Sequence, residues 1–265
     1  MGVFDSGVGG LTVAAALREL LPAENIFYIG DTARVPYGGK SPATIERYSM
    51  EISGLLLAER AKMIVVACNT ASALGVPRLE ETLKVPVTGV IVPGARAALK
   101  ATRNGRIGVI GTRATIYSRA YERAIHEIET GVSVISQACP LLVPLIEEGW
   151  VDDPVTAQVI ERYLEKMVHA QVDTLVLGCT HYPLLRPAIQ KFLGPGITLV
   201  DSAQNCALAV RELLKTKQLA APRAHLGRLE VALTDASDGF LRVAEEALGL
   251  RVGDVQLRTV QGVAP

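Results

Sequence analysis

Short runs of aliphatic and β-branched residues alternate along the chain with longer stretches that mix apolar and polar positions. The apolar runs predict strands at Gly2–Phe4, Ile26–Ile29, Met63–Ala67, Val87–Val92, Ile107–Ile110, Val132–Ile135, Thr174–Leu177, Ile197–Val200 and Leu229–Leu233. The longer stretches predict helices at Leu11–Leu21, Thr44–Ala61, Ala114–Ile128, Val155–Ala170 and Asn205–Lys215. Several strands are apolar at every position, which is typical of strands covered on both faces. We therefore expect an α/β fold with mainly parallel sheets and helices on both faces.

A weak internal repeat divides the chain into two similar parts. The segment Ile64–Thr70 resembles Leu175–His181, which lies 111 residues later, and Gly2–Ser6 resembles Gly108–Thr112, 106 residues later. Each part has one strand that ends in a small polar residue and a later strand that ends in cysteine. We interpret the repeat as two pseudo-symmetric α/β lobes with the active site in the cleft between them. The predicted first lobe comprises residues 1–93 and 207–265, and the second comprises residues 94–206.

The composition indicates a globular protein without a net charge. Of the 265 residues, 49% are apolar and 20% are charged, which is enough apolar material for a sizeable core. The 27 Lys and Arg residues balance the 27 Asp and Glu residues, so the charge does not favour nucleic acid as a partner. No apolar run reaches the roughly 20 residues of a membrane span, and no basic segment leads the chain. We therefore expect a cytoplasmic protein that binds neither nucleic acid nor membrane.

Polar residues directly follow three predicted strands: Asp-Ser-Gly-Val-Gly-Gly at positions 5–10, Cys68-Asn69-Thr70 and Cys179-Thr180-His181. Ligands of open α/β sheets bind at the carboxyl ends of strands, so these junctions are the candidate site. The glycine-rich segment matches neither the dinucleotide-binding motif nor the P-loop. Its backbone amides could form a nest for a phosphate or a carboxylate, and a tight turn explains the glycines equally well. Asp5 and Ser6, at the end of the strand, fit a functional role better.

Two of the four cysteines have the surroundings of reactive thiols. Cys68 and Cys179 stand at equivalent strand ends, and each is followed by an amide or hydroxyl side chain. Such a position at the amino end of a helix predicts a thiol pKa below the usual value of about 8.5. We interpret Cys139 and Cys206 as small buried apolar residues. The wide spacing of all four cysteines predicts neither a zinc site nor a disulfide.

A pair of thiols facing one cleft suits a reaction that removes a proton from one face of a carbon atom and returns a proton to the other face. One base cannot serve both faces without crossing the molecule, whereas each of two bases can act as the acid for the other. A single nucleophilic cysteine would leave the second thiol unexplained. Asp5 and His181 then become partners that tune the proton affinity of the two thiols.

Several segments of the chain resemble glutamate racemases, in the aspartate/glutamate racemase superfamily. The matching segments are Gly2–Thr12, Gly30–Gly38, Ala67–Ala71, Cys139–Gly149 and Gly178–Pro183. The similarity covers nearly the whole chain, and its Cys-Asn-Thr and Cys-Thr-His motifs are highly specific. The resemblance implies a racemase, free of cofactor and metal, that makes D-glutamate from L-glutamate for peptidoglycan. It also implies a homodimer.

The resemblance further implies roles for individual residues. Cys68 would act as the base on D-glutamate and Cys179 as the base on L-glutamate, assisted by Asp5 and His181. The residues that would hold the substrate are Asp5, Ser6, Tyr37, Gly38, Asn69, Thr70, Thr112, Thr180 and His181. Glu147 lies in a matching acidic motif and would influence the second base, Cys179. A structural role, as a solvated carboxylate at a helix end, explains the presence of Glu147 equally well.

Two alternatives remain open on the sequence alone. Related enzymes with the same two thiols act on aspartate, hydantoins or maleate, and Thr180-His181 and Tyr37-Gly38 favour glutamate only by resemblance. A periplasmic-type ligand-binding module also has two α/β lobes around a cleft, but the paired strand-end thiols and the missing signal sequence argue against it. Incubation with L-glutamate, followed by measurement of D-glutamate, distinguishes an enzyme from a binding protein.

Overall fold

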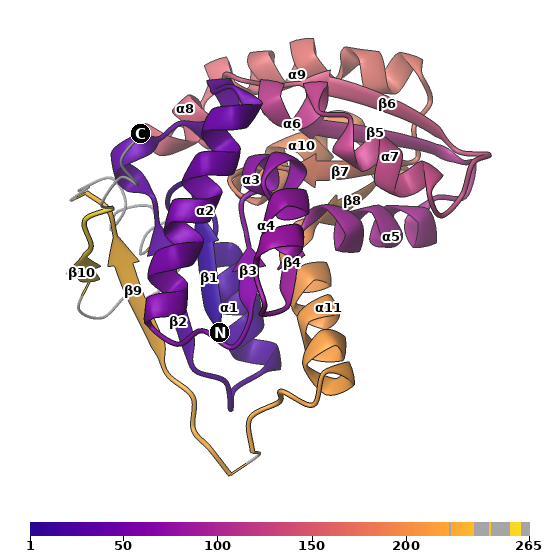
Figure 1. The fold of residues 1–265 in the computed structure, drawn as a ribbon. Coiled ribbons are helices and arrows are strands. Elements are labelled where there is room, and N and C mark those ends of the chain that lie inside the picture. Colours follow the sequence, from indigo (N-terminus) through magenta and orange to yellow (C-terminus); the bar gives the residue numbers. More distant parts are fainter. Residues whose placement is uncertain (223, 236–243, 245–254, 261–265) are drawn as a thin grey trace.

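Two parallel β-sheets form the framework of the computed structural model, which describes residues 1–222, 224–235, 244 and 255–260 (Figure 1). Among these residues one sheet has six strands and the other has four, and all neighbouring strands pair in parallel. Figure 1 shows the smaller sheet, β5 to β8, above and to the right of the larger one. Helices cover both faces of each sheet, which confirms the predicted α/β class. No helix in the described part of the chain is both long enough and apolar enough for a membrane span.

The larger sheet has the strand order β10-β9-β2-β1-β3-β4. Its strands are β1 (Gly2–Asp5), β2 (Ile26–Gly30), β3 (Ile64–Val66), β4 (Val87–Gly89), β9 (Leu229–Leu233) and β10 (Val255–Leu257). The central strand β1 lies between β2 and β3, with Val3 paired to Tyr28 on one side and to Val65 on the other. Because these strands are parallel, the carboxyl ends of β1 and β3 meet at the same edge of the sheet.

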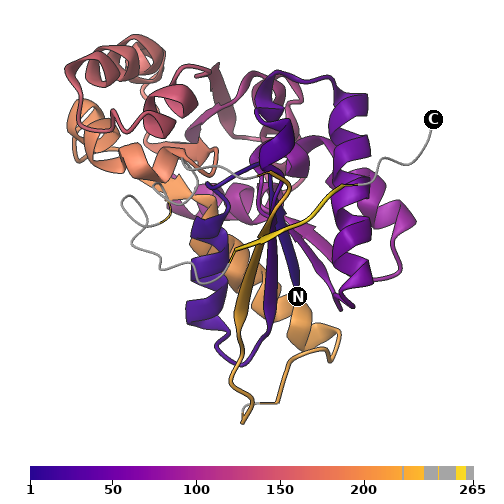
Figure 2. The ribbon, with the colours of Figure 1, turned by 90° about the vertical axis from the view of Figure 1, so that its left-hand side faces the viewer.

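Alternate residues of the larger sheet pack against helices on its two faces. Phe4 belongs to an apolar cluster with the inner face of α2 (Pro42–Ala58). Val3 belongs to a second cluster, which includes α1 (Leu11–Leu20) and α11 (Ser202–Thr216). Figure 2 shows α2 on one side of this sheet and α1 on the other, and α11 packs against α1. Complete burial of one such large aliphatic or aromatic side chain contributes about 1.5–3 kcal/mol, so both helix layers stabilise the sheet.

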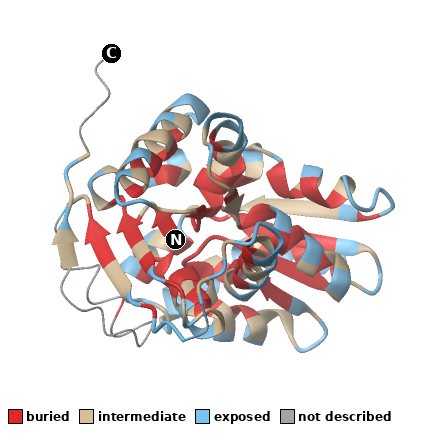
Figure 3. Ribbon diagram, turned by 60° about the horizontal axis from the view of Figure 1, so that its bottom comes forward, coloured by how far each residue is buried: buried red, intermediate tan, exposed pale blue. Residues whose placement is uncertain are grey.

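The smaller sheet has the strand order β6-β5-β7-β8 and two helix layers of its own. Its strands are β5 (Arg106–Gly111), β6 (Ser133–Ala138), β7 (Thr174–Gly178) and β8 (Thr198–Asp201). The helices of one layer are α8 (Leu142–Glu147), α9 (Pro154–His169) and α10 (Arg186–Leu193), and those of the other are α5 (Ile91–Ala101) and α7 (Ala120–His126). Figure 3 shows that buried residues gather in the strands and on the sheet-facing sides of the helices.

Short helices occupy the segments that follow strands β2, β3, β5 and β7. They are α3 (Asn69–Leu74), α4 (Val76–Thr82), α6 (Arg113–Tyr117) and the 3-10 turns η1 (Thr32–Arg34), η2 (Tyr37–Gly39) and η3 (Tyr182–Leu185). Of these, η2, α3 and α6 pack against one another. Since α3 follows β3 of the larger sheet and α6 follows β5 of the smaller sheet, their contact joins the carboxyl edges of the two sheets.

Two predicted elements differ from the structure. The strand predicted at Val87–Val92 ends at Gly89, because Ile91 starts helix α5 and packs into the core of the smaller sheet. The helix predicted at Ala114–Ile128 is two helices, α6 and α7. Arg119 lies between them with a left-handed backbone (φ 54°), which cannot continue a right-handed helix.

Helix α11 follows the smaller sheet in the sequence but packs against α1 of the larger sheet. The predicted lobe boundaries, after residues 93 and 206, fall inside α5 and α11. The division into residues 1–93 with 207–265 and residues 94–206 stays a prediction. Residues 223, 236–243, 245–254 and 261–265 of the first lobe lie outside the described residues.

Candidate active site

Four strand ends surround one cavity of about 440 Å³. The predicted site residues that line it are Ser6, Tyr37, Gly38, Cys68, Asn69, Thr70, Thr112, Glu147, Cys179, Thr180 and His181. Apolar side chains also line the cavity, namely Val35, Pro36, Pro140, Val143 and Pro144. Cys68 follows β3 of the larger sheet and Cys179 follows β7 of the smaller sheet. The structure therefore brings the two thiols to one space from opposite sheets.

Cys68 caps the amino end of α3 and lies beside two polar groups. Its Sγ atom accepts a hydrogen bond from the backbone N–H of Ala71 at 3.5 Å and lies 3.7 Å from the hydroxyl of Ser6. Burial raises the pKa of Cys68, the charge of Asp5 raises it further, and the contacts with Ala71 and Ser6 lower it, with a result of about 12. The expected lowering of this thiol pKa is therefore wrong, because a helix end does not offset burial near a carboxylate.

Cys179 lies beside an imidazole that carries a charge. Nδ1 of His181 is 3.9 Å from Sγ of Cys179, and Nε2 is 3.2 Å from Oε1 of Glu147. Burial lowers the pKa of His181, but the contacts with Cys179 and Glu147 and the charge of Asp5 raise it more, to about 10. The imidazole is therefore protonated at neutral pH. Glu147, at the carboxyl end of α8, contacts a site residue although its side chain is about half exposed.

Asp5 lies behind the cavity lining and is fully buried. Its Oδ2 atom accepts hydrogen bonds from the N–H groups of Gly7 and Gly10, both at 3.0 Å, and its Oδ1 atom accepts one from the Thr180 hydroxyl at 3.4 Å. Two amides of the glycine-rich loop thus bind a carboxylate of the same chain. A Cβ on Gly10 would lie 2.3 Å from Cβ of Asp5, so only glycine allows this approach. Asp5 therefore links the loop after β1 to Thr180, the residue that follows Cys179.

Three threonines join the two sheets at one side of the cavity. Oγ1 of Thr70 lies 2.9 Å from Oγ1 of Thr112 and 3.2 Å from Oγ1 of Thr115, and the last two atoms lie 3.0 Å apart. Thr112 also caps α6 by accepting a hydrogen bond from the N–H of Thr115. Gly38 packs so closely on Thr112 that a Cβ on Gly38 would lie 2.6 Å from the Thr112 Cβ. These contacts determine how closely the two sheets approach at the cavity.

Asp31 and Tyr121 also support the site and, like Thr115, were not among the predicted residues. Asp31 accepts a hydrogen bond from the hydroxyl of Tyr37 and pairs with Arg34 at 2.7 Å. Tyr121 donates a hydrogen bond to Oδ1 of Asn69 at 2.7 Å. Asp31 directly follows β2, so its strand-end position was a usable signal. Tyr121 lies inside a predicted helix, where no local feature distinguishes it.

Cys139 and Cys206 are fully buried within apolar clusters, which confirms their interpretation as small core residues. Cys139 belongs to the cluster that includes α9, and Cys206, on α11, belongs to the cluster that includes α1. All four cysteines, which are all described, are free thiols. Within the described residues there is no cluster of three or more His, Cys, Asp or Glu side chains that could hold a metal ion.

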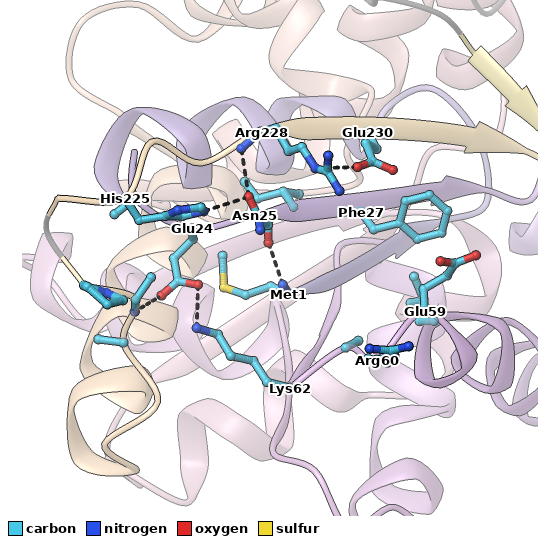
Figure 4. A pocket seen from close by; sticks show the side chains of 17 residues that line it. Met1, Glu24, Asn25, Phe27, Glu59, Arg60, Lys62, His225, Arg228 and Glu230 are labelled. Atoms are coloured by element: carbon cyan, nitrogen blue, oxygen red, sulfur yellow. Dashed lines mark hydrogen bonds and ion pairs between the residues drawn. The ribbon is translucent and has the colours of Figure 1, made fainter.

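A second cavity, of about 560 Å³, lies at the amino ends of strands of the larger sheet (Figure 4). Lys62, which precedes β3, pairs with Glu24 at 2.7 Å, and Arg228, which precedes β9, pairs with Glu230 at 2.6 Å. No cysteine lines this cavity. Its position is also opposite to the strand ends at which α/β sheets bind ligands. The cavity of the two thiols is therefore the candidate active site.

Two parallel β-sheets each contribute one strand-end thiol to a shared cavity, which is the arrangement expected of a racemase with two bases. A family model with the description Asp/Glu/Hydantoin racemase matches residues 11–210, and the chain belongs to this family. Among curated relatives, a glutamate racemase of Geobacter metallireducens is 51% identical over 255 residues, which cover 96% of this chain and 94% of that protein. A glutamate racemase of Syntrophus aciditrophicus is 48% identical over 256 residues, which cover 97% and 95% of the two chains.

Solved structures of glutamate racemases are also similar to this chain over nearly its whole length. The glutamate racemase isoform RacE1 of Bacillus anthracis superimposes with a TM-score of 0.92 at 42% identity, covering 98% of this chain and 96% of that chain. The glutamate racemase of Francisella tularensis, solved with D-glutamate, has a TM-score of 0.91 at 35% identity, covering 98% and 97%. An allantoin racemase of Klebsiella pneumoniae, at 19% identity and a TM-score of 0.55, shares the fold alone.

Proposed function

We propose that this protein interconverts L- and D-glutamate with two cysteine bases and without a cofactor. The observation that carries the proposal is that Cys68 and Cys179, from equivalent strand ends of the two sheets, line one cavity. The curated relatives named glutamate racemase, at 48% and 51% identity, support glutamate as the substrate. The cavity volume of about 440 Å³ is within the range of small-molecule sites.

The two thiols act on opposite faces of the glutamate Cα. In the direction from L- to D-glutamate, the Cys179 thiolate removes the Cα proton, and the Cys68 thiol donates a proton to the other face. The roles reverse when D-glutamate is the substrate, and exchange of protons with solvent then restores the starting state. The Cα proton is much less acidic than a thiol, so the site must stabilise the carbanion-like transition state strongly.

The neighbours of each thiol support these roles. The protonated imidazole of His181, 3.9 Å from Cys179, stabilises the thiolate that removes the proton, and Glu147 keeps that imidazole charged. On the opposite side, burial and, to a lesser degree, the charge of Asp5 keep Cys68 protonated, because they raise its pKa to about 12. Cys68 is therefore present as the acid that the reaction of L-glutamate requires.

The remaining predicted residues hold the carboxylates and the amino group of glutamate. Hydroxyl and amide side chains are suitable donors to carboxylate oxygens. The donors of this kind in the cavity are Ser6, Asn69, Thr70, Thr112 and Thr180, and Tyr37 and Gly38 form the adjoining wall.

Further predictions belong to the same proposal. The D-glutamate formed would be used for peptidoglycan synthesis, and the enzyme would act as a homodimer in the cytoplasm. The four free thiols support a reducing compartment, because oxidising compartments favour disulfides. Of the two predicted lobes, residues 1–93 with 207–265 would carry the base for D-glutamate, and residues 94–206 would carry the base for L-glutamate.

Racemisation in deuterated water tests the two-base reaction. The purified protein is incubated with L-glutamate, without pyridoxal phosphate or metal, and D-glutamate is measured over time. Early in the reaction, mass spectrometry should find deuterium at Cα of the product and little in the remaining substrate. The reason is that the donating thiol has exchanged with solvent, while the abstracted proton stays on the other thiol.

Three results would contradict parts of this proposal. An early product largely free of deuterium would indicate a single base that returns the original proton. Absence of D-glutamate would contradict the activity itself. Loss of activity on dialysis, with recovery when a cofactor is added, would contradict a reaction without a cofactor.

A further inference from the structure

We infer that Tyr121 is a positioning residue that orients the amide of Asn69 toward the substrate. The inference rests on the proposed function, in which Asn69 is one of the groups that hold glutamate. Tyr121 lies on α7, which belongs to the smaller sheet, whereas Asn69 begins α3, directly after the first thiol. A contact between Tyr121 and Asn69 therefore joins a helix of the smaller sheet to the residue that follows the thiol of the larger sheet.

The hydrogen bonds of Asn69 determine which way its amide points. The hydroxyl of Tyr121 donates to Oδ1 of Asn69 at 2.7 Å, and Nδ2 of Asn69 donates to Oγ of Ser202 at 3.4 Å. The amide N–H₂ group has two hydrogens, and Ser202 accepts only one of them. Asn69 lines the cavity, so the second hydrogen is available to a carboxylate oxygen of glutamate. The Tyr121 hydroxyl thus keeps the donor end of the amide available for the substrate.

The ring of Tyr121 is held in a slot between two glycines. A Cβ on Gly94 of α5 would lie 3.1 Å from both Cε1 and the hydroxyl oxygen of Tyr121, and a Cβ on Gly178 would lie 3.2 Å from Cε2. The Tyr121 side chain is only 2% exposed, so it has no room to take another position. Gly178 immediately precedes Cys179. One buried tyrosine therefore contacts residues adjacent to both thiols.

Removal of the hydroxyl should weaken glutamate binding without removing a reacting group. In Tyr121→Phe, Oδ1 of Asn69 loses its donor and the amide loses its fixed direction, while the ring still fills the slot. An interaction that is equal in the ground state and the transition state acts on KM and leaves kcat unchanged. We expect KM to rise about tenfold for both enantiomers and kcat to stay within about twofold.

The control variant is Tyr117→Phe on α6, whose side chain is 75% exposed and which should racemise like the wild type. A double-mutant cycle with Asn69→Ala then tests the route of the effect. If Tyr121 acts through Asn69, Tyr121→Phe should cause no further rise of KM in the Asn69→Ala background. Thermal unfolding of each variant shows whether it is folded.

Gly94→Ala is a milder change that displaces the Tyr121 hydroxyl without altering a residue of the cavity. Gly94→Ala places a methyl group 3.1 Å from the Tyr121 hydroxyl, so the hydroxyl must shift by a few tenths of an ångström. We expect a rise of KM of about threefold, which disappears in the Tyr121→Phe background. If Tyr121→Phe does not fold, the Asn69→Ala background provides the test, because the rise of KM caused by Gly94→Ala should disappear there as well.

The outcomes separate this inference from the proposed function. A wild-type KM in both Tyr121→Phe and Gly94→Ala would overturn the inference and leave the racemase activity intact. Effects of Tyr121→Phe and Asn69→Ala that multiply, or a fall in kcat at unchanged KM, would overturn it as well. A wild-type protein that does not racemise glutamate would overturn the proposed function and, with it, the role assigned to Tyr121.

Discussion

Cys68 and Cys179 both follow buried parallel strands but have differently charged neighbours. The carboxylate of Asp5 lies near Cys68 and, together with burial, raises the pKa of that thiol to about 12. Cys179 has the protonated imidazole of His181 at 3.9 Å. The protonated form of Cys68 is therefore favoured, whereas Cys179 lies beside a positive charge. This asymmetry means that the two cysteines can be tested separately.

Replacing either cysteine by Ser should abolish racemisation in both directions. The serine hydroxyl holds its proton much more tightly than a thiol, so one face loses its base, and we expect a loss of about 10²–10⁴-fold. A one-way elimination from a glutamate analogue with a β-leaving group needs only one base. Cys68→Ser should still eliminate from the L-isomer through Cys179, and Cys179→Ser from the D-isomer through Cys68.

Assays of both variants against both isomers of the analogue check the assignment of faces. Serine is nearly isosteric with cysteine, so thermal unfolding should remain close to that of the wild type. An equal loss of elimination on both isomers would contradict the assignment. Nearly normal racemisation by one variant would remove that cysteine from the reaction.

Glu147→Gln should shift the pH dependence of the reaction with L-glutamate. The Glu147 carboxylate contributes to the raised pKa of His181, about 10, so its removal lowers that pKa. His181 then loses its positive charge at a lower pH, and the alkaline limb of the kcat/KM profile moves to lower pH. At pH 9 we expect kcat/KM to fall by roughly tenfold.

Glu148→Gln is the matched control, because Glu148 is the exposed neighbour of Glu147 on the same turn. Its pH profile should coincide with that of the wild type. An unchanged profile in Glu147→Gln would show that the carboxylate does not act on His181, and Glu147 would then be only a solvated residue at the end of α8. High salt should reduce the effect, because the Glu147 side chain is about half exposed.

At the scale of elements, the strands could be predicted because burial on both faces leaves a local signature in the sequence. Runs such as Ile64–Val66 are apolar throughout, and the structure has a strand there. The same signature misleads at Ile91, which is buried because a helix packs its apolar face on the smaller sheet. Local composition reports burial, but it does not report which element provides it.

The position of the two thiols in one cavity could also be predicted, since the internal repeat places one thiol at a strand end in each half and ligands bind at such strand ends. The supporting contacts could not. The Tyr121–Asn69 hydrogen bond joins residues 52 positions apart, and the Asn69–Ser202 bond joins residues 133 positions apart. Such pairs depend on how helices of different sheets pack together, which no local pattern specifies.

Gly38→Ala should disturb the contact between η2 and α6. The new Cβ would lie 2.6 Å from Cβ of Thr112, so η2 must move away from the threonines that join the sheets. We expect a destabilisation of about 1–3 kcal/mol and a raised KM for glutamate. Urea unfolding and steady-state kinetics measure the two effects.

Gly39→Ala is the control for this substitution, because a Cβ on Gly39 has no heavy atom within 4 Å. Its free energy of unfolding should differ from that of the wild type by no more than about 0.5 kcal/mol. A Gly38→Ala variant that is as stable and active as Gly39→Ala would contradict the tight approach of η2 to Thr112.

At the scale of the whole molecule, the two sheets meet through side chains that are sequence neighbours of the thiols. Thr70, two residues after the first thiol, contacts Thr112, and Thr180, directly after the second, donates to Asp5. The separation of the two bases therefore depends on how the sheets and their helices approach each other. A glutamate held between them would add contacts to both, so its binding should stabilise the whole molecule.

The single tryptophan, Trp150, allows this to be measured, because it follows α8 beside the smaller sheet. Its fluorescence reports unfolding around that sheet, whereas far-UV circular dichroism reports the helices of both sheets. D-glutamate at about a hundred times its Kd should raise the free energy of unfolding by about 2.7 kcal/mol in both signals, with coincident midpoints. Sodium chloride at equal ionic strength should leave both midpoints unchanged. A rise in only one signal would show that glutamate binds to one sheet and its helices alone, which contradicts a cavity shared between the two thiols.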